Sequence, residues 1–209
     1  ANCHHITLSY CAFRYPSRVH VFLFATVNDV TVEYCYLFWC RAYDDTGGAQ
    51  HAQSFDGDNN ARVIIRHNLF HDNTGTFIIG VLSRGAASTP SDDWEIYGNV
   101  FYDDGGRSRY AASDSPICVI NDREANGWKI YNNTFMGLTP NGANGNVGID
   151  FSQGTTTSGG NQVYNNLWYD HRSQNDEANI TFEPGDATSV HDYSYWNSIT
   201  TYPSETNGS

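Results

Sequence analysis

The chain has 209 residues, 39% of them apolar and 14% aromatic, which is enough for one domain with a sizeable hydrophobic core. It carries 23 acidic and 11 basic residues, so its formal net charge is −12, and Lys129 is its single lysine. This charge argues against nucleic acid or an anionic membrane surface as a partner, and the sequence has no apolar run long enough to span a bilayer.

An eight-residue motif recurs along the chain. Its six clear copies begin at residues 6, 30, 63, 94, 128 and 161, with intervals of 24, 33, 31, 34 and 33 residues, and a weaker seventh passes through 195–197. Such a period is typical of solenoids, in which a repeat buries its apolar face only against its neighbours. No linker divides the repeats, so we expect one domain over residues 1–209. Because the chain begins inside a repeat, without a capping helix, we also expect it to be part of a larger chain or assembly.

The pattern inside the motif predicts a strand, a bend and a return to the core. Positions 1 and 3 are apolar and positions 2 and 4 mostly polar, which is the alternation of a half-buried strand. Asn recurs at positions 5 and 6, where it tolerates the left-handed backbone of a tight turn. Aligned across repeats, the position 6 side chains should form a hydrogen-bonded ladder and the position 8 rings an internal stack. The residues at position 8 are Phe13, Leu37, Phe70, Phe101, Phe135 and Trp168.

A second apolar strand is expected after each motif. These strands are predicted at residues 19–24, 50–56, 76–82, 116–122, 147–152 and 179–183, between turns rich in Gly, Asn, Asp and Ser. Three connections are longer than a turn, at residues 84–92, 103–114 and 154–160. Insertions in solenoids often lie on the binding face. No helix of note is expected.

Three segments resemble the coils of a known fold: His-Asn-Leu-Phe at 67–70, Asn-Asn-Thr-Phe at 132–135 and Asn-Asn-Leu-Trp at 165–168. They resemble the right-handed parallel β-helix of the pectin-lyase-like superfamily and of many viral tailspikes. The resemblance covers residues 2–198 and implies an all-β protein, a single right-handed parallel β-helix of about seven coils. It further implies an extracellular protein, secreted or on a surface, that acts on or binds a polysaccharide as a lyase or a hydrolase.

Whether the chain is an enzyme stays open at this point. The Arg-x-Pro-x-x-Arg pattern of pectate lyases is absent, and so is the Asn-Thr-Asp, Asp-Asp and Gly-His-Gly cluster of polygalacturonases. The same fold also hosts adhesins and structural spikes. The alternative is therefore a non-catalytic spike, fibre or filament subunit that assembles through its open ends.

One predicted outer face belongs to the motif itself. Tyr97, Tyr131 and Tyr164 share position 4 of successive repeats, and Glu95 and Lys129 share position 2. Aromatic rings with polar neighbours suit the apolar face and polar edges of a sugar, so these five residues are candidate substrate-binding residues. Alternatively, the tyrosines only stabilise one another and Glu95 and Lys129 form an ordinary surface ion pair.

The other predicted face follows the second strands. Stacked repeats would bring a row of charged side chains into one groove beside the insertions: Asp56, Arg84, Asp122, Arg123 and Asp150. Paired carboxylates in this row would serve hydrolysis. Carboxylates that hold Ca²⁺, with an arginine as base, would instead serve β-elimination, which makes Ca²⁺ the expected cofactor. The alternative is a row of solvated strand ends.

Cysteine and histidine spacings do not predict a zinc site. Cys11 and Cys35 share position 6 of adjacent repeats, so they are either within disulfide range or two small buried thiols. Cys40 has Cys3 or Cys118 as alternative partners, and the odd count of five leaves one thiol over. His67 and His71 have helical spacing but lie on a predicted strand and bend, where they would not face each other.

Overall fold

The computed structural model describes residues 3–16, 19–24, 27–40, 53–72, 77–82, 91–102, 117–120, 125–137, 147–153, 159–169, 178–182 and 186–197. Every regular element in these ranges is a β-strand. Among these residues, accordingly, no helix is found that could cross a membrane.

The strands form three large sheets, two of seven strands and one of six. Sheet A, in spatial order, contains β1 (His4–Ser9), β4 (Asn28–Glu33), β7 (Val63–Arg66), β11 (Glu95–Tyr97), β15 (Lys129–Tyr131), β18 (Gln162–Tyr164) and β21 (Val190–Asp192). Sheet B contains β2 (Ala12–Arg14), β5 (Tyr36–Phe38), β8 (Leu69–His71), β12 (Val100–Tyr102), β16 (Thr134–Met136), β19 (Leu167–Tyr169) and β22 (Tyr195–Asn197). Sheet C contains β3 (Val19–Leu23), β6 (Gln53–Gly57), β9 (Phe77–Leu82), β13 (Ile117–Ile120), β17 (Val147–Gln153) and β20 (Ala178–Thr181).

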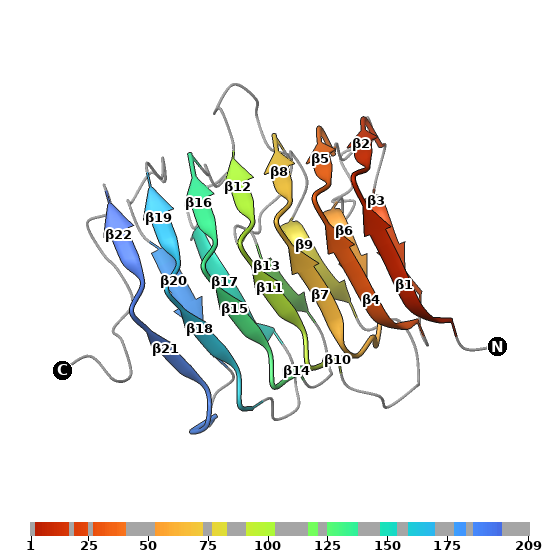
Figure 1. Cartoon of the computed structure of the whole chain (residues 1–209). Coiled ribbons are helices and arrows are strands. Elements are labelled where there is room, and N and C mark those ends of the chain that lie inside the picture. The colour runs from red at the N-terminus through yellow and green to blue at the C-terminus, as the bar shows by residue number, and fades with distance from the viewer. Residues whose placement is uncertain are drawn as a thin grey trace, which may run out of the picture.

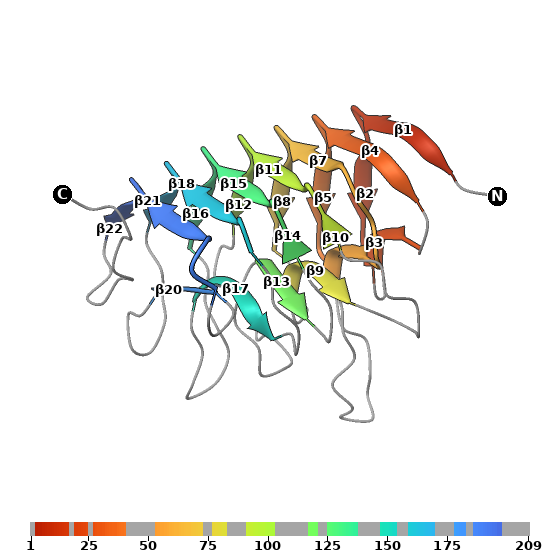
Figure 2. The ribbon, with the colours of Figure 1, turned by 90° about the horizontal axis from the view of Figure 1, so that it is seen from below.

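All pairing between the strands of these sheets is parallel, and each strand pairs with its counterpart in the next repeat. Figure 1 shows sheets A and B side by side with sheet C behind them, and the colours run in chain order along the stack. Figure 2 separates sheet C from sheet A. Two short strands, β10 (Ser91–Asp92) and β14 (Ala125–Asn126), add a small fourth sheet. The expected all-β architecture of parallel strands is confirmed, and the arrangement is compatible with a β-helix.

Strand register confirms the sequence alignment of the repeats. Ile96, at position 3 of its motif, pairs with Ile65 on one side and with Ile130 on the other. Phe101 likewise pairs with Phe70 and Phe135, at position 8. These side chains are fully buried, so the inward rows of the sheets make one continuous core. The rings of sheet B are stacked, with centroid separations of 4.8, 4.7 and 4.0 Å along Phe70, Phe101, Phe135 and Trp168.

The bend between sheets A and B has left-handed backbone in every repeat. Asn132 and Asn165 have φ of 54° and 52°, as position 5 predicts, but the same conformation is held by non-Asn residues in the other repeats. Those residues are Tyr10, Tyr34, His67, Gly98 and Tyr193. A left-handed residue that is not Gly costs about 1–2 kcal/mol, so the fold must stabilise these corners by other contacts.

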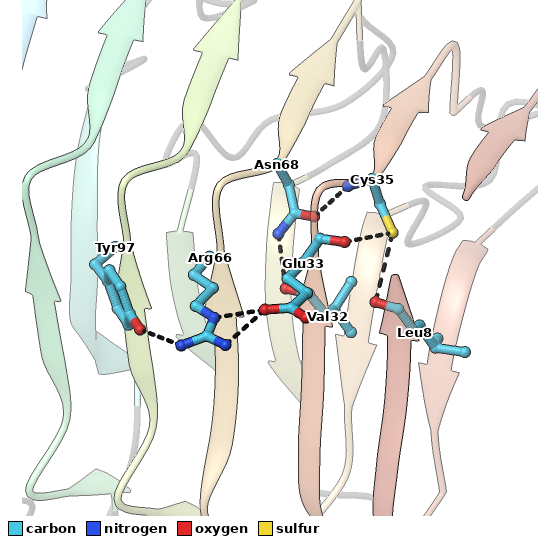
Figure 3. Close-up of polar contacts among 7 residues, drawn as sticks. All are labelled: Leu8, Val32, Glu33, Cys35, Arg66, Asn68 and Tyr97. Carbon is cyan, nitrogen blue, oxygen red and sulfur yellow. Dashed lines mark hydrogen bonds and ion pairs between the residues drawn. The ribbon is translucent and has the colours of Figure 1, made fainter. Parts of the chain in front are cut away.

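The ladder of position 6 supplies such contacts. Asn68 accepts a hydrogen bond from the Cys35 N–H at 2.9 Å and donates one to the Val32 carbonyl at 2.9 Å (Figure 3). Asn99 accepts from the N–H of Asn68 in the same way, at 2.9 Å. Because each Asn is buried and satisfies backbone groups of the preceding repeat, it fixes the corner as well as the spacing between repeats.

The four cysteines with described side chains are free thiols, and Cys118 lies outside that set. The Cys35 thiol donates to the carbonyls of Glu33 at 3.2 Å and Leu8 at 3.6 Å. Burial raises its pKa, and burial raises the pKa of Cys40 to about 12. Of the two alternatives for Cys11 and Cys35, the disulfide is not formed: both are free thiols, with Cys35 buried and Cys11 half-buried.

Candidate functional site

Two of the five residues predicted for the charged row of sheet C lie in the described part of the chain. Asp56 and Asp150 occupy one row of the sheet, linked in register through Gly80 and Cys118. Three strand spacings of about 4.8 Å place them about 14 Å apart. That exceeds the separation of a glycosidase carboxylate pair, about 5–9.5 Å, and is too long for one Ca²⁺. Asp56 is also fully buried, and Arg84, Asp122 and Arg123 lie outside the described residues.

The predicted tyrosine row on sheet A is present. Tyr97 and Tyr131 stack with centroids 4.8 Å apart, and Tyr131 and Tyr164 with centroids 5.0 Å apart. Lys129 lies 3.5 Å from Glu95, and Tyr131 donates to Glu95 at 3.4 Å. Burial, with the charge of Glu95 adding to it, raises the pKa of Tyr131 to about 12. The structure therefore brings these five candidate residues together.

The geometry of this row limits how it can bind. The interplanar angles are 8° and 1°, so the rings cover one another's faces and present edges and hydroxyls to solvent. Arg66 lies at one end of the row. Its Nε donates a hydrogen bond to Glu33 at 2.7 Å, and its Nη1 donates one to the Tyr97 hydroxyl at 2.9 Å (Figure 3). Sugar rings stack on aromatic faces, so this row offers hydrogen bonds more than stacking.

The outer face of sheet B is a third surface, which the sequence patterns did not predict as a site. Its outward side chains alternate with the buried row and are largely apolar or aromatic; Leu69, Val100 and Leu167 are each 37% exposed. None of the outward side chains described on these strands is a carboxylate, although the chain carries a net charge of −12. They are Ala12, Arg14, Tyr36, Phe38, Leu69, His71, Val100, Tyr102, Thr134, Met136, Leu167, Tyr169 and Tyr195. We refer to this set as the sheet B face.

A hydrogen-bonded chain of three side chains starts on the sheet B face at Tyr36 and His71 and ends inside the protein at Asp72. Tyr36 Oη lies 2.8 Å from His71 Nδ1, and His71 Nε2 lies 3.2 Å from Asp72 Oδ2. Asp72 is buried and also accepts from the Trp39 indole N–H at 3.1 Å. A carboxylate at Nε2 favours the tautomer with the proton on that nitrogen, so Nδ1 accepts the Tyr36 proton. This is the hydroxyl, imidazole and carboxylate order of a proton relay.

The relay has aromatic walls and a nearby cation. The Phe38 ring stacks on Tyr36 with centroids 4.6 Å apart, and Tyr102 stacks on His71 at 4.9 Å. Arg14 lies over Phe38, 5.0 Å from the ring centroid. Burial and the charge of Asp72 raise the pKa of Tyr36, whereas the positive charge of Arg14 opposes this rise. Tyr36 therefore stays protonated at neutral pH, as a proton donor should.

One group of metal-ligating side chains occurs among the described residues. His4, His5 and Asp29 place one ligand atom each within 4.8 Å of one another. Arg62 holds both oxygens of Asp29, and this ion pair is the first cause of the lowered pKa of Asp29. A cation here would have to displace the guanidinium, so the group is a weak metal site.

Comparison of the chain with family models, with curated proteins and with solved structures found no match.

Proposed function

We propose that the chain is a single right-handed parallel β-helix of about seven coils, one for each strand of its seven-stranded sheets. We further propose that it works outside the cell and binds a polysaccharide along the sheet B face. A solenoid flank repeats the same chemistry at each coil, which suits a polymer of repeating units. The binding surface would then lie beside the tyrosine row that the sequence predicts, across the left-handed corner.

The sheet B face is the observation that supports this proposal. It extends from β2 to β22 and combines aromatic rings, hydroxyls and aliphatic side chains without an outward carboxylate on its described strands. Sugars present an apolar C–H face and polar edges, which such a surface complements. Because none of the outward side chains described on its strands is a carboxylate, this part of the surface places no negative charge against a glycan that carries carboxylates.

Affinity electrophoresis against alginate, polygalacturonate and a neutral glucan tests the proposal. We expect at least one polymer to retard the chain, and the double variant Leu167→Ala/Tyr169→Ala to weaken that retention about tenfold, equal to about 1.4 kcal/mol. Tyr193→Asn is the control, because Tyr193 is 70% exposed at the corner and Asn suits its left-handed backbone. No retention by any polymer would overturn polysaccharide binding, and loss only in Tyr131→Ala would move it to sheet A.

The second candidate function is a structural or adhesive subunit that associates end to end. In the described part of the chain, β1 and β21 are the outermost strands of sheet A, and each pairs on one side only. Exposed strand edges of this kind can pair with another copy. A structural subunit of this kind needs only the ordered stack of strands and side-chain rows, and it needs no catalytic residues.

A further inference from the structure

We propose that His4, His5 and Asp29 bind a divalent transition metal ion such as Zn²⁺, and that Arg62 competes with the metal for the Asp29 carboxylate. The two histidines lie on β1 and Asp29 lies on β4, the neighbouring strand of sheet A, so this site is separate from the sheet B face. A metal ion held by all three side chains would tie the first repeat to the second.

The backbone at His5 brings the two imidazoles together. Successive residues of a strand ordinarily place their side chains on opposite faces. His5 instead has left-handed backbone, with φ of 59°, and its ring lies against the His4 ring with centroids 4.6 Å apart. Asp29 holds the same register position on β4, because Ile6 pairs with Val30, and it is also left-handed, with φ of 55°. The corner therefore places two imidazoles beside a carboxylate, an arrangement that regular strands would not give.

The ligand set indicates the kind of metal. Each of the three side chains places one ligand atom within 4.8 Å of the others. Tetrahedral zinc, at about 2.0–2.2 Å from its ligands, needs separations of about 3.4 Å. Both histidines are exposed and Asp29 is half-buried, so small rotations of the exposed rings would close this difference, and water can take the fourth position. Imidazole nitrogen suits zinc, copper or nickel, whereas Ca²⁺, the metal expected for the charged row of sheet C, takes oxygen ligands.

Arg62 weakens the site without closing it. Its Nε and Nη2 donate to the two oxygens of Asp29, and its side chain is 56% exposed. Ion pairs at such exposure contribute little, because water and salt screen them. Arg62 is also the main cause of the lowered pKa of Asp29, so this carboxyl is kept in the ionised form that binds a metal. The displaced guanidinium has a second carboxylate in reach of its charge, since the pKa of Arg62 is raised by Asp29 first and also by Asp93.

The metal would strengthen one edge of the structure. In the described part of the chain, β1 is the outermost strand of sheet A and pairs with β4 alone. The three ligands meet only when these two strands are paired, because Asp29 belongs to the next repeat. A ligand that binds the folded chain better than the unfolded chain stabilises the folded state, so zinc should stabilise this strand pair.

The test is calorimetric titration of ZnCl₂ into the whole chain, prepared without a histidine tag and freed of metal with a chelator. We expect one zinc ion per chain. Asp29→Asn and His5→Asn should each weaken binding at least tenfold, since loss of an outer-shell partner alone costs about 10- to 100-fold in metal affinity. Asn adopts left-handed backbone readily, so both variants keep the corner. Arg62→Asn, at a third left-handed position, should instead tighten binding roughly two- to fivefold, because it removes only the competitor.

Two comparisons separate metal ligation from other effects. Asp29→Asn and Arg62→Asn break the same ion pair, so opposite changes in their zinc affinity cannot come from the loss of that pair. Arg66→Gln is the matched control, because Arg66 forms the neighbouring ion pair with Glu33, and it should bind zinc as the wild type does. Cys3→Ser should also bind zinc normally, which tests the exposed thiol that precedes the two histidines.

Thermal unfolding followed by circular dichroism gives a second readout and establishes that each variant is folded without zinc. Zinc should raise Tm of the wild type and of Arg62→Asn, but not of Asp29→Asn. No zinc binding by the wild type, or equal affinity in the wild type and Asp29→Asn, would overturn the site. Loss of binding in Cys3→Ser would overturn the three-ligand set, and unchanged affinity in Arg62→Asn would overturn the competition.

Discussion

The His20 side chain is hydrogen-bonded to residues of two different sheets. Its Nε2 lies 3.0 Å from the Phe38 carbonyl and its Nδ1 lies 3.1 Å from Ser54 Oγ. The carbonyl can only accept, so Nε2 carries the proton and Nδ1 accepts from the hydroxyl. Burial lowers the pKa of His20 to about 4, against the opposing effect of the hydrogen bond to Phe38.

This pKa predicts a loss of stability in acid. Below pH 6.5 the unfolded chain binds a proton at His20 while the folded chain does not, so the free energy of unfolding falls as the pH decreases from 6.5 towards 4. His20→Gln should remove this contribution, on the order of 2 kcal/mol after allowance for partial exposure. Urea unfolding of both proteins at pH 7 and pH 4.5 measures it. An equal acid loss in the two proteins would contradict the prediction.

At the scale of elements, the Asn ladder connects the A-to-B corners from the second repeat to the sixth. Asn99 accepts from the backbone and side chain of Asn68 and donates to the Ile65 carbonyl at 2.8 Å and to Asn133 at 3.0 Å. Since all of these groups are buried, removal of the Asn99 side chain leaves the Asn68 N–H and the Ile65 carbonyl of the preceding repeat without that partner, and the side chains of Asn68 and Asn133 lose one bond each.

Asn99→Ala should therefore lower the free energy of unfolding by about 3 kcal/mol, since each buried polar group left without a partner costs about 1–3 kcal/mol. Asn132→Gly is the matched control: Asn132 is exposed at the neighbouring position, with φ of 54° that glycine also adopts. Urea unfolding at pH 7 compares the two. Similar small losses in both variants would mean that the ladder contributes little.

At the scale of the whole molecule, the sheet edges and the net charge have opposite effects on association between copies of the chain. Unpaired edges of β1 and β21 favour end-to-end contact between copies, whereas a net charge of −12 repels them. Salt screens this repulsion over distances beyond about 8–10 Å near physiological ionic strength. Association through the ends should therefore increase with salt.

Light scattering at micromolar concentration, with electron microscopy of the same sample, decides between the two candidate functions. If the chain is a filament subunit, we expect rods with a repeat of about 30–35 Å, from seven strand spacings of about 4.8 Å, growing as NaCl is added. A monomer at all salt concentrations would argue against end-to-end assembly and favour the polysaccharide-binding function.

Much of the architecture was predictable because it is periodic. Strand, bend and core ring recur at nearly constant intervals, so aligning the repeats also aligns the rows of Asn99 and Phe101 with their neighbours. The second strands were predictable for the same reason; the strand predicted from residue 50 is β6, described from Gln53, and residues 50–52 lie outside the described residues. The spread of left-handed backbone to residues such as Tyr34 was not, because its cost is offset by contacts from other repeats.

The relay shows what sequence alone could not supply. Tyr36 and His71 are separated by 35 residues, at positions 7 and 9 of adjacent motifs, and position 9 lies beyond the eight-residue pattern. A period determines which residues share a row, because it sets the register between repeats. Which side chains meet across rows depends on how each corner turns the backbone and on the rotamers that the stacked rings allow. The sequence by itself therefore determined the parallel all-β stack and its buried rows, and only the tertiary structure placed Tyr36, His71 and Asp72 in contact.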